Sequence, residues 1–212
     1  MSSTLVILTR ALETGIDLCC KRLHHIMTTN TTDPRPQYVA GTWKIDPAHS
    51  KVSFTVKHLM ISKVRGTFDI VDVTIVTAED PHNSTIEAVI DVASVNTGHP
   101  GRDGHLRTND FFLVETFPTM TFHSTSLNAE GDDFTVEGDL TLRGVTKTVT
   151  MKGEFGGLIT DADGNTRAGA TATTTVNRLD YGVNWNAALE AGGMTLGNDV
   201  KIELDIQVVL QK

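Results

Sequence analysis

Hydrophobic and polar residues alternate with a period of two along most of the chain after residue 41. The clearest stretch is the last one, where every second residue is apolar: Val200, Ile202, Leu204, Ile206, Val208 and Leu210. A helix would scatter these side chains around its circumference, whereas a strand gathers them on one face. The pattern therefore predicts a strand at 200–210 with one buried face.

The same alternation recurs upstream in stretches that are separated by turn-forming residues. Inward-facing rows are expected within 52–58, 64–70, 73–76, 86–92, 120–122, 134–142, 149–155 and 168–172. The alternation breaks between the second and third of these rows, which predicts an irregularity at Val71 and Asp72. About eight strands with mostly short connections favour one of two all-β architectures, a sandwich or a closed antiparallel barrel.

The row at 168–172 differs from the others because its members are small: Ala168, Ala170 and Ala172. A closed barrel of about eight strands is either filled by its own side chains or holds one small ligand. Small residues fit both cases, because they match the taper of a filled barrel and they also border a cavity. The row by itself leaves both interpretations open.

One stretch, at residues 102–112, departs from the alternation. Its charged residues are Arg102, Asp103, His105, Arg107 and Asp110, and it ends on two adjacent phenylalanines. A charged, irregular or briefly helical segment of this kind is either a solvated surface loop or a polar cap over an apolar interior. The second interpretation makes this stretch the candidate polar end of a binding site.

The first forty residues follow a different pattern. Apolar residues between positions 5 and 23 recur at three- and four-residue spacing, which suits an amphipathic helix. The apolar run is too short for a signal peptide, and Met27 precedes a Thr- and Pro-containing stretch typical of a linker. The helix either binds a membrane surface or a partner, or it belongs to an extension outside the folded unit. We expect residues 1–40 to be such an extension and residues 41–212 to be the folded domain.

Charge and cysteine content exclude several classes of protein. With a net charge of −8, the 212-residue chain lacks the basic excess that nucleic-acid binding requires, and electrostatic attachment to anionic lipid is disfavoured. No apolar run approaches the roughly 20 residues that span a bilayer. Both cysteines, Cys19 and Cys20, lie in the extension, so the domain has neither a disulfide framework nor a thiol catalyst. These features suit a cytoplasmic protein.

Several short motifs follow one another along the domain. They are Trp-Lys-Ile-Asp-Pro-Ala-His-Ser at 43–50, Val-Ser-Phe-Thr-Val-Lys-His-Leu at 52–59, Val-Arg-Gly-Thr-Phe at 64–68, Asn-Thr-Gly at 96–98, Arg-Asp-Gly-His-Leu-Arg at 102–107, Asp-Phe-Phe at 110–112, Phe-Pro-Thr-Met-Thr-Phe at 117–122, Gly-Asp-Leu-Thr-Leu-Arg-Gly-Val-Thr-Lys at 138–147 and Asn-Arg-Leu-Asp-Tyr-Gly at 177–182. In this order and spacing the domain resembles the YceI-like family of polyisoprenoid- and lipid-binding proteins. The resemblance implies an eight-stranded antiparallel lipocalin-like barrel over residues 41–212, with a short helical insertion around residues 100–112. It also implies a long apolar tunnel for an isoprenoid or acyl chain.

The inward rows and the end of the charged stretch supply the candidate tunnel residues. They are Phe54, Phe68, Phe112, Phe122, Val136, Leu140, Met151 and Ala170. Each of them is equally acceptable as an ordinary core residue. A bound chain would gain about 25 cal/mol for each Å² of apolar surface that it buries, so long chains need few polar contacts.

Three donors in the charged stretch are candidates for binding a polar head group: Arg102, His105 and Arg107. Guanidinium and imidazole groups suit the oxygen atoms of a pyrophosphate, a quinone or a carboxylate. The alternative is that they pair with Asp103 and Asp110 and fix the insertion. Asp103 and His105 would also suit acid/base catalysis, but no nucleophile motif or Gly-rich phosphate loop accompanies them. The histidines follow no recognised metal-ligand spacing.

We therefore expect a single-domain barrel that binds, stores or transports a polyisoprenoid or a related amphiphile and that is not an enzyme. Isoprenoid quinones, prenyl pyrophosphates and fatty acyl compounds are the ligands to consider, with no metal and no other cofactor. The expected partners are a membrane or a donor protein in transient contact, and a homodimer is a further option. One rival is an enzyme that uses the charged residues of 102–107 as an acid/base and anion site. The other is a barrel filled by its own side chains that acts only through protein contacts.

Overall fold

The computed structural model describes residues 38–188 and 194–212. The predicted amphipathic helix, the linker and both cysteines lie within residues 1–37, outside the described part of the chain. The predictions for the extension therefore stay predictions. Residues 36–212 group into one compact unit.

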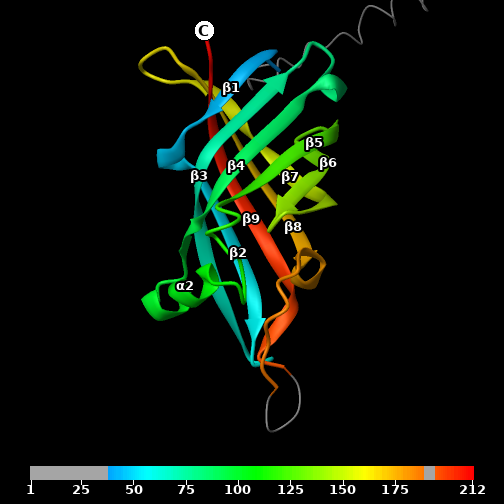
Figure 1. The fold of residues 1–212 in the computed structure, drawn as a ribbon. Coiled ribbons are helices and arrows are strands. Elements are labelled where there is room, and N and C mark those ends of the chain that lie inside the picture. The colour runs from blue at the N-terminus through cyan, green and yellow to red at the C-terminus, as the bar shows by residue number, and fades with distance from the viewer. Residues whose placement is uncertain (1–37, 189–193) are drawn as a thin grey trace, which may run out of the picture. The chain divides into compact units, whose positions relative to one another are not determined.

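The strands of the described residues belong to one antiparallel sheet. They are β1 (Gly41–Ile45), β2 (Lys51–His58), β3 (Ser62–Thr77), β4 (Thr85–Asn96), β5 (Thr119–Glu130), β6 (Asp133–Leu142), β7 (Val145–Thr160), β8 (Thr166–Asn177) and β9 (Leu196–Leu210). Between them lie the helix α2 (Pro100–Arg107) and the short 3₁₀ turns η1 (Pro47–His49), η2 (Pro81–Asn83) and η3 (Arg178–Tyr181). Helix α2 and the chain end after β9 lie toward opposite ends of this sheet (Figure 1).

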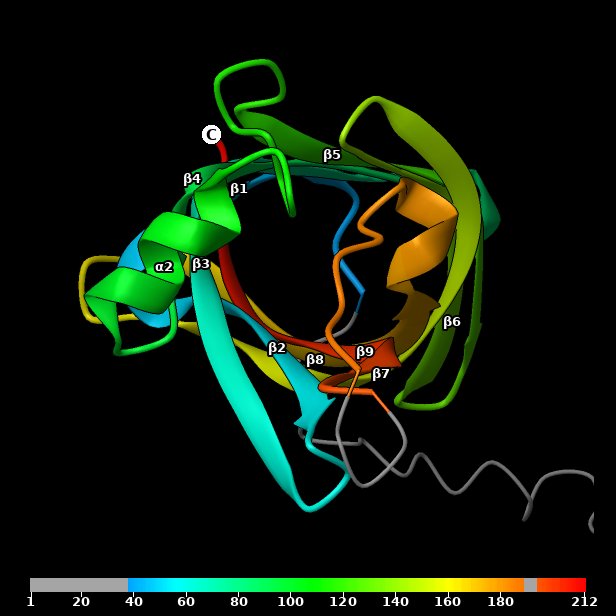
Figure 2. The same cartoon turned by 60° about the horizontal axis from the view of Figure 1, so that its bottom comes forward.

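The sheet closes on itself into a barrel. Strands β3 to β9 pair in chain order, and β9 returns to pair with both β1 and β2. Strands β1 and β2 also both pair with β3, so they share one position in the wall, interrupted by η1. The wall therefore has eight positions, and a view toward the helix end shows them as a ring (Figure 2). The predicted eight-stranded antiparallel barrel is confirmed.

Strand β3 changes its inward row at the expected irregularity. Before it, even-numbered positions such as Phe68 border the interior, and after it odd-numbered positions such as Val73 do. The pairing with β4 shifts between Ile70 and Asp72, as in a β-bulge. The irregularity predicted from the sequence at Val71 and Asp72 is confirmed.

Three glycines of the wall lie beneath phenylalanine rings of the neighbouring strand. Any Cβ atom at these positions would collide with the ring above it. Glycine therefore lets the ring lie along the wall, which is a known reason for glycine inside a strand. The pairs are Phe54 over Gly66, Phe122 over Gly138 and Phe134 over Gly153. Because the rings lie along the wall, they leave room nearer the barrel axis.

One end of the barrel, which we call the filled end, is closed by packed side chains. Trp43, Leu158 and Val208 are buried there in a single cluster. The indole Nε1 of Trp43 donates to Thr77 Oγ1 at 2.9 Å, so its polar atom is satisfied. The opposite end, which carries α2 and the turn between β2 and β3, is called the helix end below.

Helix α2 is capped at its start and bonded to the barrel at its end. At its start, the His99 ring accepts a hydrogen bond from Arg102 N at 3.2 Å and caps the helix. At its end, Arg107 donates to two carbonyls of β4, that of Ala93 at 2.6 Å and that of Val95 at 3.0 Å. The short helical insertion predicted around residues 100–112 is confirmed, with the helix ending at Arg107.

Candidate ligand-binding site

Two adjoining cavities occupy the barrel interior. Cavity 1, at the helix end, has a volume of about 300 Å³, and cavity 2, deeper in the barrel, has about 160 Å³. Four wall residues border both of them: Val52, Met120, Leu140 and Ile202. The cavities are therefore neighbouring compartments of one lumen, and the walls of both are mostly apolar.

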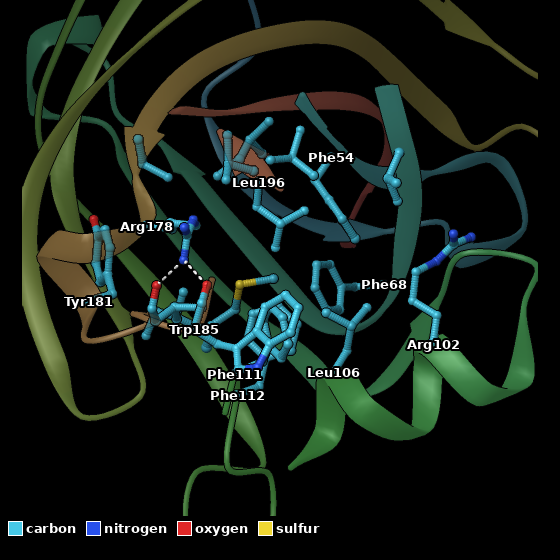
Figure 3. A pocket seen from close by; sticks show the side chains of 18 of the residues that line it. Phe54, Phe68, Arg102, Leu106, Phe111, Phe112, Arg178, Tyr181, Trp185 and Leu196 are labelled. Atoms are coloured by element: carbon cyan, nitrogen blue, oxygen red, sulfur yellow. Dashed lines mark hydrogen bonds between the residues drawn. The ribbon is translucent and has the colours of Figure 1, made fainter. Parts of the chain in front are cut away.

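Phenylalanine rings form one side of cavity 1. The rings of Phe54 and Phe68 have centroids 5.2 Å apart, and the Phe112 ring meets Phe68 edge-on at 5.7 Å. Figure 3 shows these residues on β2, β3 and the segment after α2, gathered around the same space. Such rings offer a large apolar surface at fixed positions, which suits an apolar chain.

The structure places all eight candidate tunnel residues in the walls of the two cavities. Phe54, Phe68 and Phe112 line cavity 1. Phe122, Val136, Met151 and Ala170 line cavity 2, and Leu140 lines both. Their contact with a ligand stays a prediction, because a wall residue also serves the core. Each of them lies in a cavity wall, as contact with a ligand requires.

A second group of aromatic rings lies at the rim of cavity 1. The His105 ring packs edge-on against Phe111 at 5.0 Å and against Trp185 at 5.2 Å. Its Nε2 lies 2.8 Å from Asp110 Oδ2. One face of α2 is thereby joined to the segment after η3, across the mouth of the cavity.

The three candidate head-group donors have different surroundings. Arg102 and His105 line cavity 1, whereas Arg107 does not and is bound to β4 carbonyls. Arg102 is exposed, and it donates through Nε to Thr97 Oγ1 at 2.7 Å and through Nη2 to Thr97 O at 2.9 Å. A head-group role for Arg102 and His105 stays a prediction, and nothing in the geometry of Arg107 supports one.

The proposed acid/base partners on α2 do not contact each other. Asp103 is buried and accepts a hydrogen bond from the backbone N–H of Thr97 at 2.9 Å, and another from its hydroxyl group. The Thr97 hydroxyl lowers the pKa of Asp103, although burial opposes this effect. His105 bonds Asp110 instead. Asp103 thus holds the start of the insertion, and the geometry does not form an Asp103–His105 pair.

Arg178, at the start of η3, is a cavity residue that the sequence did not reveal. Its side chain lines cavity 1, although the residue is only 6% exposed. Nε donates to Gly197 O at 2.9 Å. Nη1 donates to Val183 O at 2.6 Å and to Trp185 O at 2.8 Å (Figure 3). Burial lowers the pKa of the guanidinium. In the described residues it forms no ion pair.

The local sequence around η3 explains the position of Arg178. Asn177 caps the turn by accepting a hydrogen bond from Leu179 N at 3.0 Å. Gly182 ends it with a φ of 72°, in the left-handed region that glycine tolerates. Tyr181, in the same turn, is 1% exposed, and its hydroxyl group has no hydrogen-bond partner in the described part of the chain. Burial raises the pKa of this hydroxyl.

Two further features of the described residues concern metal sites and membrane spans. No cluster of three or more His, Cys, Asp or Glu side chains there has the geometry to hold a metal ion. Within the same residues, no helix has the length and apolar character needed to cross a bilayer.

Comparison with known proteins assigns the family. The profile of the YceI-like domain matches residues 43–208. The chain belongs to the YceI-like family. Among curated relatives, the UPF0312 protein SA2479 of Staphylococcus aureus (strain N315) is 42% identical over 161 residues, which cover 74% of this chain and 91% of that protein. The family predicted from the motifs is confirmed.

Solved structures share the YceI-like barrel. The YceI protein of Campylobacter jejuni is 28% identical with a TM-score of 0.60, and the match covers 84% of this chain and 99% of that one. A domain from Saccharophagus degradans, described as polyisoprenoid binding, is 20% identical with a TM-score of 0.62 and covers 80% and 98%. YceI-like domains are binding barrels and not enzymes, which agrees with the prediction for this chain.

Proposed function

We propose that the protein binds one polyisoprenoid or related amphiphilic lipid inside its barrel and stores or carries it without changing it chemically. The observation that carries this proposal is the two-compartment lumen with its mostly apolar wall. Each ~100 Å² of chain surface buried there would contribute about 2.5 kcal/mol. Ordering the chain offsets part of that gain. A chain that reaches both compartments would therefore bind more tightly than one confined to cavity 1.

The relatives support the same class of ligand. The Saccharophagus degradans domain is described as polyisoprenoid binding, and it shares the barrel fold with this chain at low sequence identity. The rival enzyme interpretation lacks comparable support. Its acid/base candidates are separated, because Asp103 bonds Thr97 and His105 bonds Asp110.

The experiment is to extract the purified protein with organic solvent and to analyse the extract by mass spectrometry. We expect a long-chain amphiphile at close to one molecule per protein. Delipidated protein should take up a fluorescent long-chain probe with the same stoichiometry. If the delipidated protein takes up no long-chain probe, the barrel is not a lipid carrier. A chemically altered probe after incubation would instead favour the enzyme.

We further propose that the helix end contacts a membrane when lipid is exchanged. The turn between β2 and β3 exposes two large apolar side chains, Met60 at 63% and Ile61 at 86%. On either side of this turn, His58 and Val64 line cavity 1. The exposed apolar tip therefore lies next to the cavity, where a lipid would enter or leave.

Two lysines favour an anionic bilayer as the partner. Lys57 and Lys63 face each other across the hairpin and are exposed, although the whole chain carries a net charge of −8. Basic residues near an anionic surface contribute about 1 kcal/mol each. Replacing Met60 and Ile61 together by Ser should slow lipid transfer between vesicles that contain phosphatidylglycerol. The control is Val71→Ser, another exposed apolar residue on β3. Equal transfer rates in both variants and the parent would rule out this contact surface.

A further inference from the structure

Arg178 places a buried positive charge on the wall of an otherwise apolar cavity. Burying a cation is costly unless an anion compensates it, and proteins normally pair such a group. In the part of the chain that the structure describes, no carboxylate pairs with Arg178, and its hydrogen bonds go to main-chain carbonyls alone. Those carbonyls accept hydrogen bonds from Nε and Nη1 but leave the net charge in place.

Not every N–H group of Arg178 has a hydrogen-bond acceptor among the described residues. A guanidinium has five N–H groups, one on Nε and two on each Nη. Nε has one acceptor and Nη1 has two, namely the carbonyls of Gly197, Val183 and Trp185. Among the described residues, Nη2 has no acceptor. Arg178 therefore combines an uncompensated charge with donor capacity, in a side chain that borders cavity 1.

Arg102, the other guanidinium that lines this cavity, is in a different position. It lies on the opposite side of the pocket in Figure 3, beyond Phe68 and Leu106. It is exposed to solvent and bonded to Thr97. Water screens such a charge, so it gains little from a ligand anion. The two arginines therefore do not form one site for a multiply charged group such as a pyrophosphate.

We propose that Arg178 binds the carboxylate of an acyl or isoprenoid acid, whose apolar chain extends from cavity 1 toward cavity 2. The inference rests on the proposed lipid-binding function and names the polar end of its ligand. One carboxylate supplies the single negative charge that Arg178 lacks, and its two oxygens match the geometry of a guanidinium edge. A neutral quinone or alcohol would accept a hydrogen bond but would leave the charge uncompensated.

A matched pair of probes tests this assignment. Palmitic acid and palmitamide have the same chain, and only the acid is charged. Binding of each to delipidated protein is measured by titration calorimetry for the parent and for Arg178→Gln. We expect the variant to bind the acid roughly tenfold to a hundredfold more weakly, the range for a hydrogen bond to a charged group. Binding of the amide should change less than about threefold, since the apolar contacts are unaltered.

Arg143→Gln is the control for a purely structural loss. Arg143 also donates to main-chain carbonyls, those of Phe111 at 3.0 Å and Gly182 at 2.6 Å, but it does not line either cavity. This variant should bind the acid and the amide in the same ratio as the parent.

Equal losses of acid and amide in Arg178→Gln would make Arg178 a structural residue, and the lipid-carrier proposal would stand without this anchor. Failure of the parent to bind either probe, together with an organic extract that holds no long-chain amphiphile, would instead overturn the lipid-carrier proposal. If Arg178→Gln does not fold, a pH titration of the ligand bound to the parent protein tests the role of Arg178 instead. The carboxyl carbon of ¹³C-labelled palmitic acid should then titrate at a lower pH when bound than when dispersed in detergent. An unchanged or higher titration midpoint would overturn the anchor.

Discussion

The two ends of the barrel each hold an arginine, and the two arginines differ in how their charge is compensated. Arg167, on β8 near the filled end, bonds Asp46 through Nη1 and Asp161 through Nε, each at 2.6 Å. These two carboxylates raise the pKa of its guanidinium. Arg178, at the opposite end of β8, has main-chain carbonyls instead, and burial lowers its pKa.

The packing around the two arginines also differs. Near Arg167 the barrel is packed with Trp43, Leu158 and Val208, whereas Arg178 borders cavity 1. A charge that is neutralised by the protein's own side chains stabilises the fold. A charge that borders a cavity and that no side chain neutralises can still be neutralised by a bound anion. Arg167 is therefore a structural residue, and Arg178 is a candidate for binding a ligand.

The largest expected effect tests whether the filled end is really packed. Leu158→Ala should destabilise the protein by about 2–5 kcal/mol, because the surroundings of a buried leucine relax only partly. Leu158 is 7% exposed in the cluster at that end. Met151→Ala should cost less, since Met151 already borders cavity 2 and loses fewer packed neighbours. Urea denaturation of both variants measures the difference. Equal losses would mean that the two regions are equally packed.

The next prediction fills the hollow region. Ala170 lines cavity 2, so the ring of Ala170→Trp should occupy volume that a lipid chain would use. Losing about 100 Å² of chain burial would cost about 2.5 kcal/mol of binding, nearly a hundredfold in affinity. The melting temperature of the ligand-free protein should hold or rise, because the ring adds apolar contacts.

Thr173→Trp is the matched control for this variant, because Thr173 is exposed on the same strand. Both variants must be delipidated before melting, since a bound ligand raises apparent stability. An Ala170→Trp protein that binds lipid as well as the parent would show that cavity 2 is not used.

A smaller effect concerns the compensated arginine and depends on pH. The hydrogen bond from Arg167 is the main cause that lowers the pKa of Asp161 from 3.8 to about 2. Because the folded pKa is below the unfolded value, the ionised form stabilises the fold above pH 3.8. This contribution is lost as the pH falls through about 2. Arg167→Met should therefore melt at a lower temperature than the parent at pH 7. The gap should narrow between pH 4 and pH 2, and a constant gap would refute the linkage.

The smallest expected effect comes from the chain outside the barrel. Deleting residues 1–26 should leave lipid affinity and the free energy of unfolding nearly unchanged, because the strands and the family match begin later, at residues 41 and 43. Titration of the probe and urea denaturation measure both quantities. A loss of several kcal/mol would show that the extension belongs to the folded unit.

The barrel and its wall could be predicted because they depend on local alternation. Period-two rows predicted the inward face of β9, and the break at Val71 and Asp72 predicted the bulge in β3. Even the small residue Ala170 was placed on the correct face, since alternation along a strand leaves only two choices.

The polar end of the site could not be predicted in the same way. Charge density drew attention to α2, where Arg107 and Asp103 hold the helix to the barrel. Two of the carbonyl partners of Arg178, those of Val183 and Trp185, follow in an irregular segment that no periodicity describes. The third, that of Gly197, lies far along the chain at the start of β9. A buried charge is a property of the closed barrel, so the alternation of hydrophobic and polar residues does not signal it. The one local sign was the Asn-Arg-Leu-Asp-Tyr-Gly motif at 177–182.

The pairing of β9 with β1 and β2 closes the barrel through contacts between distant parts of the sequence. Trp43 pairs with Leu210, so the wall is closed by two strands that lie far apart in the sequence. Contacts between residues so distant in sequence form slowly, in about milliseconds to seconds for β-rich domains. Without them, the sheet would stay open and its apolar inward face would enclose no lumen. The lumen therefore depends on this long-range pairing, and enclosing a lipid requires the same contacts that close the barrel.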